Sequence, residues 1–240
     1  MIVLAVESAT ELAGVALADE SGVLASATVS RGRRHAESIA PAVEFVCRRA
    51  GVPLADVGAV AVDVGPGLFT GLRVGVGTAK ALSFALGIPL VGIGSLEALA
   101  HAAAAAVPDG ALVVPVVDAR RAEVFTARFR ASGAAATRVG EDERRTPDAL
   151  AAELAGLGEP FVLAGNGARR YAATLGAVPG ATVAGESLDH PGPHAVAVLG
   201  VARAAAGATS DPAEVLPRYL RDADTRINWE RRARRAERGA

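Results

Sequence analysis

The chain is poor in several residue types that mark particular classes of protein. Its 240 residues include one cysteine, Cys47, and one lysine, Lys80, and only 4% of the residues are aromatic. A single cysteine excludes a disulfide framework and a zinc site built from several thiolates. Lys and Arg (25) nearly balance Asp and Glu (26), so the charge does not indicate a strongly basic nucleic-acid binder.

Long hydrophobic runs are also missing. No stretch reaches the roughly 18 apolar residues of a membrane span, and the alanine run 102–106 is followed closely by Pro108. The first residues lack a basic leader, and Glu7 interrupts their apolar run, so we expect no signal peptide. These features, with the single cysteine, lead us to expect a cytoplasmic protein without a membrane partner.

The most distinctive segment is Gly-Pro-Gly-Leu-Phe-Thr-Gly-Leu-Arg at residues 65–73. An alternating apolar run precedes it, which predicts a strand, a glycine turn and a helix at 70–86 with Thr70 as N-cap. Free amides at a helix start also attract phosphate. However, the segment lacks the Gly-Lys-Ser/Thr ending of a Walker loop and the third glycine of a dinucleotide fingerprint. We therefore favour a tight turn that packs the helix onto the sheet.

The predicted helix 70–86 has two further features. Gly71, Gly75 and Ala79 lie four residues apart, which predicts a stripe where another segment approaches closely. The helix is apolar nearly all round, which predicts a second cover besides its own sheet. Arg73 in the first turn opposes the helix dipole, so it needs a carboxylate, from Asp63 or a partner, or a bound anion.

The remaining pattern is α/β. Three apolar runs at 2–6, 13–18 and 23–29 predict an antiparallel meander, and 35–50 predicts an amphipathic helix. Ser95 is expected to cap a helix to about 106. A second set follows, with strands at 112–117, 124–130 and 161–164, a helix capped at Thr146 and a helix at 195–206. Both halves begin with antiparallel strands and continue into α/β units, which predicts a duplicated, two-lobed α/β architecture.

Four motifs recur in this order in a known family. They are Glu7-Ser8-Ala9-Thr10, the segment 65–73, Val117-Asp118-Ala119-Arg120 and Pro217-Arg218-Tyr219-Leu220-Arg221. The chain resembles the TsaB (YeaZ) family of bacterial tRNA threonylcarbamoyladenosine biosynthesis, from Ile2 to about Trp229. It departs at Leu68, where the family usually has serine. The resemblance implies the two-lobed fold of actin, Hsp70 and sugar kinases, with an N-terminal lobe at 1–100, a C-terminal lobe at 101–216 and an arginine-rich tail at 217–240.

The resemblance also implies a function without catalytic residues of its own. Members bind and activate the TsaD-type threonylcarbamoyltransferase, a TsaE-type ATPase joins the assembly, and tRNA is contacted indirectly through the complex. Alone, the chain is expected to form a homodimer, and ATP or ADP with Mg²⁺ belongs to the complex rather than to a site firmly occupied here. The expected partner interface lies on the N-lobe helices and comprises His35, Ile39, Val43, Val46, Thr70, Arg73, Val74 and Gly77.

Glu7, Ser8 and Thr10 occupy the place where kinases of this fold hold phosphate and magnesium, which leaves a residual nucleotide contact open. Those kinases carry a glycine where this chain has Ala9, so we favour the alternative that the three residues serve a hairpin turn. Asp118 is likewise either part of a second phosphate hairpin or a turn aspartate that pairs with nearby arginines. Since no Gly-Gly follows it, we favour the turn.

Two other groups of residues give weaker evidence of a function. His190 and His194 have the spacing of a helical metal pair, but Pro-Gly-Pro separates them, so we expect no metal site. The arginine-rich tail, with Trp229, is either a solvated end or an RNA contact, and we favour the solvated end. The alternative function is an ATP-dependent small-molecule kinase of the same fold. Chain length and the missing phosphate glycine oppose it.

Overall fold

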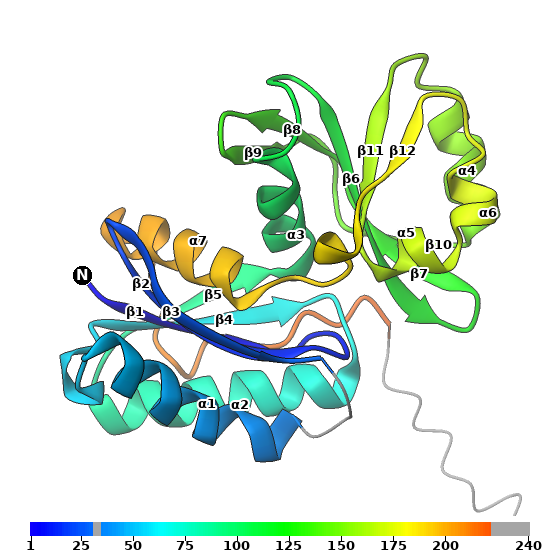
Figure 1. Ribbon diagram of the computed structural model, residues 1–240. Helices are drawn as coiled ribbons and strands as arrows, with labels where there is room; N and C mark the ends of the chain where they lie inside the picture. The colour runs from blue at the N-terminus through cyan, green and yellow to red at the C-terminus, as the bar shows by residue number, and fades with distance from the viewer. Residues whose placement is uncertain (31–34, 222–240) are drawn as a thin grey trace, which may run out of the picture.

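The computed structural model describes residues 1–30 and 35–221. The chain forms two lobes, each built on a mixed β-sheet with helices packed against it (Figure 1). This two-lobed α/β arrangement agrees with the prediction from the sequence. None of the helices in the described ranges combines the length and apolar character that crossing a bilayer requires.

The first lobe contains a five-stranded sheet of order β3-β2-β1-β4-β5. Strands β1, β2 and β3 form the predicted antiparallel meander, and β4 and β5 add in parallel to β1. The register pairs Val3 with Ala18 on one side and with Ala59 on the other. The strands are β1 (Val3–Glu7), β2 (Ala13–Asp19), β3 (Gly22–Val29), β4 (Ala59–Gly65) and β5 (Leu90–Gly94).

Helices cover both faces of this sheet because its strands are apolar on both sides. Helices α1 (His35–Ala50) and α2 (Phe69–Leu86) pack on the face that carries Leu4 and Val6. Helix α7 (Pro193–Ala205) packs on the opposite face, which carries Val3 and Ala5 (Figure 1). Alternation of side chains along β1 produces this division. A short 3₁₀ helix, η1 (Leu54–Asp56), follows α1.

The second lobe contains a seven-stranded sheet in which β10-β7-β6-β11-β12 are neighbours and β8 and β9 extend from β6. Thr146 Oγ1 accepts a hydrogen bond from Ala149 N at 3.2 Å, as the predicted cap of α4 requires. The strands are β6 (Leu112–Arg120), β7 (Glu123–Thr126), β8 (Phe129–Ser132), β9 (Ala135–Arg138), β10 (Glu143–Arg145), β11 (Phe161–Ala164) and β12 (Ala181–Val183). The helices are α3 (Ser95–Ala104), α4 (Pro147–Ala155), α5 (Asn166–Arg170), α6 (Ala172–Leu175) and the 3₁₀ helix η2 (Glu186–Leu188).

Two helices cross between the lobes, so the predicted divisions at residues 100 and 216 do not follow the packing. Helix α3 buries Leu96 and Leu99 against the second sheet. Helix α7 returns to the first sheet, where a Cβ added to Gly200 would lie 2.6 Å from Ala61 Cβ. Residue Ser210 then forms a bridge with Leu90 at the edge of that sheet. Apolar periodicity identifies such helices but not the sheet that each one covers.

Two predicted caps are wrong. Helix α2 begins at Phe69 with Leu68 in the N-cap position and without a side-chain cap, so Thr70 lies exposed within the first turn. The helix begins earlier because Leu68 N donates to Ala9 O at 2.7 Å, which docks the loop on the β1–β2 connection. Ser95 is the first residue of α3, and its hydroxyl donates to Asp63 rather than capping the helix.

Candidate functional site

The glycine loop packs directly on the β1–β2 connection. A Cβ added to Gly71 would lie 2.1 Å from Ser8 O, and one added to Gly75 would lie 2.2 Å from Ser8 Oγ. Ser8 Oγ donates to Gly71 O at 2.9 Å, so the two segments are also joined by a buried hydrogen bond. At Gly67, the added Cβ would lie 2.2 Å from Ala9 O. The close-packing stripe is therefore confirmed, and the glycines admit a neighbouring segment of the same chain.

Two carboxyl groups are buried beneath this junction. Glu7 and Asp63 are 0% and 1% exposed, at the ends of β1 and β4. Asp63 Oδ1 accepts from Ser95 Oγ at 2.6 Å and from Gly65 N at 2.7 Å, whereas Glu7 Oε1 accepts from Ala9 N at 2.8 Å. Glu7 Oε2 and Asp63 Oδ2 are buried without another donor.

The pKa values of both carboxyls are raised. Burial raises the pKa of Glu7 well above its usual value, and the charge of Asp63 and a hydrogen bond to it raise the pKa further. Burial also raises the pKa of Asp63, which its hydrogen-bond donors partly offset. Both shifts favour the protonated acid, and the shift of Glu7 is the stronger. The pair joins the starts of the two loops that meet at Ser8 and Gly71.

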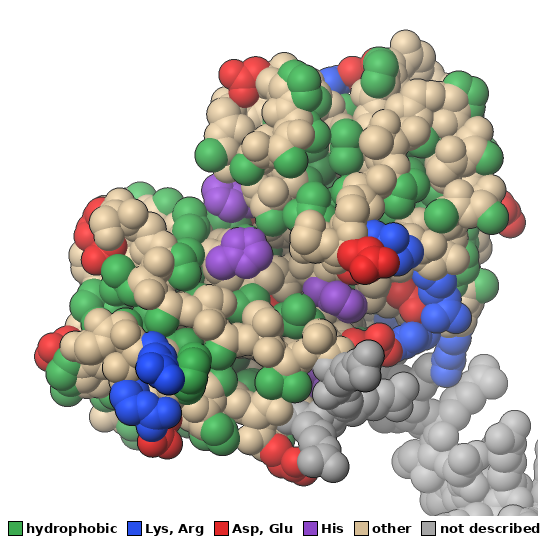
Figure 2. Space-filling view, viewed as in Figure 1, with side chains coloured by type: hydrophobic (Ala, Val, Ile, Leu, Met, Phe, Trp, Pro, Cys, Tyr) green, Lys and Arg blue, Asp and Glu red, His purple; other side chains and the backbone are tan. Residues whose placement is uncertain are grey.

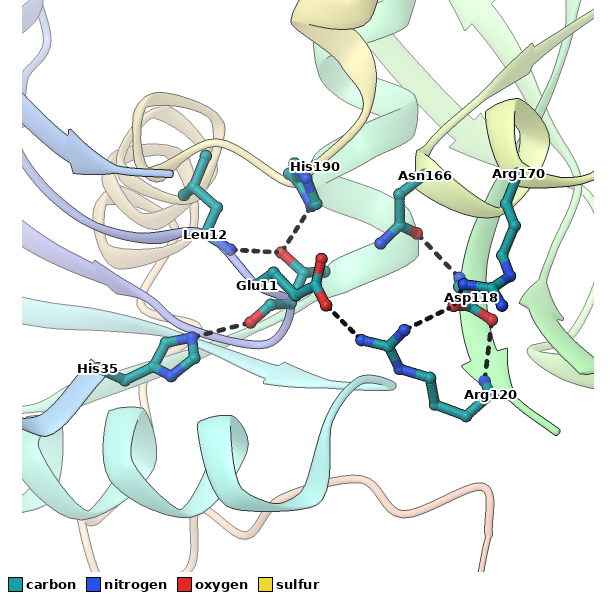
Figure 3. Close-up of polar contacts among 9 residues, drawn as sticks. Glu11, Leu12, His35, Asp118, Arg120, Asn166, Arg170 and His190 are labelled. Atoms are coloured by element: carbon teal, nitrogen blue, oxygen red, sulfur yellow. Dashed lines mark hydrogen bonds and ion pairs between the residues drawn. The ribbon is translucent and has the colours of Figure 1, made fainter. Parts of the chain in front are cut away.

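Thr10 has hydrogen-bond partners from both lobes. His35 Nε2 lies 2.9 Å from Thr10 O, and His190 Nδ1 lies 3.0 Å from Thr10 Oγ1 (Figure 3). Leu12 N donates to the same hydroxyl at 3.4 Å. Burial lowers the pKa of His190, which favours its neutral form. Figure 2 shows histidine side chains along the recess between the lobes.

The three residues considered for nucleotide contact are thus turned inward. Glu7, Ser8 and Thr10 are each at most 1% exposed, and each side chain has a partner within the protein. This geometry favours the hairpin-turn interpretation. His190 lies beside Thr10, whereas His194 is exposed near the start of α7. Within residues 1–30 and 35–221, no cluster of three His, Cys, Asp or Glu side chains is suited to hold a metal ion.

An arginine spans the recess between the lobes. Arg120 pairs with Glu11 of the first lobe through Nη2 and with Asp118 Oδ2 of the second at 3.2 Å through Nη1 (Figure 3). Asp118 also lies 3.4 Å from Arg170 Nη1, and its backbone N donates to Asn166 Oδ1 at 2.9 Å. The interpretation of Asp118 as a turn aspartate paired with arginine is confirmed. The link from Arg120 to Glu11 joins residues 109 positions apart, so no local sequence pattern indicates it.

The turn that presents Arg120 has an unusual backbone. Residues Arg120, Arg121 and Ala122 all have positive φ, at 63°, 55° and 56°. Non-glycine residues in this region are strained, and three in succession are rare. The turn is stabilised by Asp118 Oδ1, which accepts from Arg120 N at 2.9 Å.

The outer face of α1 and α2 is different in character. A groove of about 610 Å³ runs between the two helices and is lined largely by apolar groups. Phe45 and Phe84 are 39% and 85% exposed on these helices. The groove is lined by Ala40, Val43, Glu44, Cys47, Arg48, Gly51, Val52, Pro53, Leu54, Thr78 and Leu82.

The structure corrects part of the predicted partner interface. Ile39 and Val46 are 1% and 0% exposed in the core beneath α1, and His35 is 6% exposed beside Thr10. Val43 is 6% exposed and forms part of the groove floor. The apolar stripe of α1 faces its own sheet, as amphipathic helices do, so it is not free for a partner. On α2, Thr70, Arg73 and Gly77 are exposed and Val74 is half-buried.

Arg73 does not meet Asp63, which is buried with Ser95. Its guanidinium lies 3.9 Å from the centre of the Phe69 ring, and its Nε donates to Tyr219 Oη at 3.4 Å. Tyr219 comes from the Pro-Arg-Tyr-Leu-Arg motif at the start of the predicted tail 217–240. The solvated-end interpretation is wrong for residues 217–221, which contact both lobes. The predicted tail beyond residue 221, including Trp229, lies outside the described residues.

Comparisons with known proteins agree with this architecture. A family model described as TsaD, tRNA N6-adenosine threonylcarbamoyltransferase, matches residues 22–229. The TsaB protein of Bacillus subtilis is 29% identical over 231 residues, which cover 95% of this chain and 98% of its own. The structure of YeaZ from Pseudomonas aeruginosa has a TM-score of 0.78 and 28% identity, covering 91% of this chain and 99% of its own. The chain belongs to the TsaB (YeaZ) family.

Other similarities are more partial. The TsaB protein of Escherichia coli is 35% identical over 131 residues, and this match spans 55% of its length and 54% of this chain. Component A of (R)-2-hydroxyglutaryl-CoA dehydratase from Acidaminococcus fermentans, at 12% identity and a TM-score of 0.51, shares the fold alone. The predicted two-lobed α/β fold, with mixed sheets flanked by helices, is confirmed. Both proteins called TsaB carry the name tRNA threonylcarbamoyladenosine biosynthesis protein.

Proposed function

We propose that the chain is a non-catalytic subunit of the machinery that forms threonylcarbamoyladenosine next to the tRNA anticodon. In this role it binds and activates a TsaD-type threonylcarbamoyltransferase. The observation that carries the proposal is the likeness to the Bacillus subtilis relative along nearly the whole of both chains. Its name specifies tRNA threonylcarbamoyladenosine biosynthesis, and the match to the transferase family model supports a partner of similar fold.

The outer face of α1 and α2 is the proposed partner surface. Phe45 and Phe84 are large apolar side chains exposed on these helices, and the groove between the helices has a mostly apolar lining. Such surfaces mark protein interfaces. Gly77, at the centre of the exposed stripe of α2, has open space around its added Cβ, so another helix could approach there. A copy of the chain would use this face in an isologous homodimer, and the transferase would compete for it.

The interior contacts of the cleft support a role without catalysis. Glu7, Ser8 and Thr10 have partners within the protein, and Arg120 is paired on both sides of the recess. We therefore propose that ATP or ADP with Mg²⁺, and a TsaE-type ATPase that uses it, act in the assembly rather than at a firmly occupied site of this chain. Contact with tRNA would then be indirect, through the transferase, in the cytoplasm.

Reconstitution tests this function. The transferase, its ATPase partner, tRNA, threonine, bicarbonate and ATP are combined with the enzyme that supplies the threonylcarbamoyl adenylate, with and without this chain. We expect modified tRNA to accumulate only when the chain is present. Equal modification in both mixtures would show that the chain is dispensable and would contradict the proposal.

The kinase alternative makes a different prediction for the isolated chain. A sugar-kinase-like enzyme should bind ATP in the cleft tightly and in a manner that depends on magnesium. Calorimetric titration of the isolated chain with Mg-ATP distinguishes the two. We expect no tight binding, because the side chains at the kinase phosphate position are buried and already paired. Tight, magnesium-dependent binding would favour the kinase.

A further inference from the structure

We propose that Arg73, held in place by Phe69 and Tyr219, is a docking point for a carboxylate side chain of the partner protein. This inference rests on the proposed function and adds the chemistry of one contact to it. It concerns the end of α2 that adjoins the C-terminal segment, residues 214–221, which passes beside the start of this helix (Figure 1).

The Arg73 side chain is held by the Phe69 ring and the Tyr219 hydroxyl. Its guanidinium stacks over Phe69 at 3.9 Å, and the rings of Phe69 and Tyr219 lie 5.0 Å apart at 36°. Tyr219 Oη accepts a hydrogen bond from Arg73 Nε at 3.4 Å. An arginine held in this way loses less conformational freedom when it binds an acidic group, because its orientation is already set.

Tyr219 is placed by contacts on both sides of it. Before it, Arg218 N donates to Val64 O at 2.6 Å, and the Arg218 guanidinium lies 2.9 Å from Asp142 Oδ2. After it, Leu220 packs against the core beneath α3, and Arg221 Nη1 donates to Ala119 O at 2.8 Å. The segment is therefore fastened to both lobes, and it presents Tyr219 to α2 as a fixed element.

The charge of Arg73 is left without an acid in the described part of the chain. Its exposed guanidinium pairs with no carboxylate of residues 1–30 or 35–221, and the Nη groups have no hydrogen-bond acceptor there. The neighbouring arginines Arg218 and Arg221 are already paired, with Asp142 and Glu123. An unpaired cation that is fixed but not neutralised is suited to an acidic group from outside.

The surroundings favour a protein carboxylate over an RNA phosphate. A phosphate backbone is contacted by several cations together, whereas Arg73 stands among Phe69, Val74 and Tyr219 with neighbouring arginines already neutralised. Positions that contribute most to binding in protein interfaces are enriched in arginine and aromatic residues beside an apolar surface. Arg73 also lies on the same exposed stripe of α2 as Gly77, on the proposed partner surface.

The test is the affinity of the full chain for a TsaD-type transferase of the same organism, measured by calorimetry at several salt concentrations. The variants are Arg73→Gln, Arg73→Lys and Tyr219→Phe. Arg170→Gln is the matched control, because Arg170 also lies over an aromatic ring, Tyr171 at 5.8 Å, but belongs to α5 of the second lobe.

We expect Arg73→Gln to weaken binding about tenfold or more and to flatten its dependence on salt. Tyr219→Phe keeps the ring but removes the hydroxyl that orients Arg73, so a loss of about threefold is expected. Lysine at position 73 should restore salt dependence but not the full affinity, because it lacks the planar fork. Arg170→Gln should bind as the wild type does.

Each other outcome is informative. Wild-type affinity and salt dependence in Arg73→Gln would overturn the inference while leaving the proposed function intact, whereas a wild type that does not bind the transferase would contradict the proposed function itself. An Arg73→Gln variant that loses binding to tRNA alone, with unchanged transferase affinity, would show a phosphate contact instead. If Asp222→Asn with Asp224→Asn abolishes the effect of Arg73→Gln, the acid belongs to this chain, and the inference is also wrong.

Discussion

Gly75 and Ser8 are in such close contact that no side chain fits between them. A Cβ added to Gly75 would lie 2.2 Å from Ser8 Oγ, and that hydroxyl is already committed to Gly71 O. Gly77, two residues further along the same helix, has nothing within 4 Å of its added Cβ. The two glycines therefore differ sharply, although the sequence presents them as part of one pattern.

Alanine substitutions at these two positions should have opposite effects. We expect Gly75→Ala to lower the free energy of unfolding by about 1–3 kcal/mol, because the methyl group must displace Ser8. Gly77→Ala should raise it by up to about 1 kcal/mol, because a helix-interior glycine is replaced without a clash. Denaturant unfolding of both variants is the measurement. Equal changes in the free energy of unfolding would show that the contact with Ser8 does not determine the cost of a side chain at position 75.

The buried pair Glu7 and Asp63 predicts a pH dependence of stability. The raised pKa of Glu7 means that the folded protein holds a proton that the unfolded chain releases once pH rises above the usual value of 4.5. The free energy of unfolding should therefore fall as pH increases from this value towards the raised pKa. Glu7→Gln replaces the protonated acid with a neutral amide, so its stability should change less over this range.

The measurement is denaturant unfolding of wild type and Glu7→Gln from mildly acidic to alkaline pH. Glu44→Gln serves as the control, because Glu44 is exposed and paired only with Arg48 of the same helix at 3.5 Å among the contacts that the structure gives it. Identical pH profiles for wild type and Glu7→Gln would mean that Glu7 is ionised in the folded protein. That result would contradict the raised pKa of Glu7.

The ion pair of Arg120 and Glu11 should restrain the lobes more than it stabilises the fold. Their side chains are 37% and 49% exposed, and partly exposed pairs contribute about 1 kcal/mol or less. We expect Arg120→Gln to change the free energy of unfolding by no more than this. Hydrogen exchange at residues 10–12 and 118–122 should nevertheless be faster than in the wild type. Unchanged exchange in both segments would show that Arg120 does not hold the lobes together.

Local structure was largely predictable from the sequence. Helix α1 has the predicted bounds, 35–50, and Thr146 caps α4 as expected. The start of α2 was missed by one residue because its first amides are positioned by Ala9 rather than by a capping side chain. Periodicity and turn chemistry act over a few residues, so they specify elements well.

Relations between distant segments were harder to predict. The apolar stripe of α1 was placed at a partner interface, although Ile39 and Val46 belong to the core of the lobe. Helix α7 covers a sheet formed much earlier in the chain. Arg73 likewise contacts Tyr219, which is 146 residues away in the sequence. Composition and spacing carry no information about such pairings.

The central claim is that the outer face of α1 and α2 binds the transferase. Ala40→Arg places a large cation in the apolar groove without touching the core, because Ala40 is exposed. Glu37 and Glu44 lie three and four residues away on the same helix, so the new arginine should not weaken α1. Ala202→Arg is the matched control. Ala202 is exposed on α7, which packs on the opposite face of the first sheet.

Sedimentation velocity of each protein, alone and mixed with the transferase, tests this claim most directly. We predict that the wild type and Ala202→Arg form a homodimer alone and a complex with the transferase. Ala40→Arg, with an unchanged circular dichroism spectrum, should remain a monomer in both experiments. A complex that forms equally well with Ala40→Arg would contradict the account and place the interface on another face of the chain.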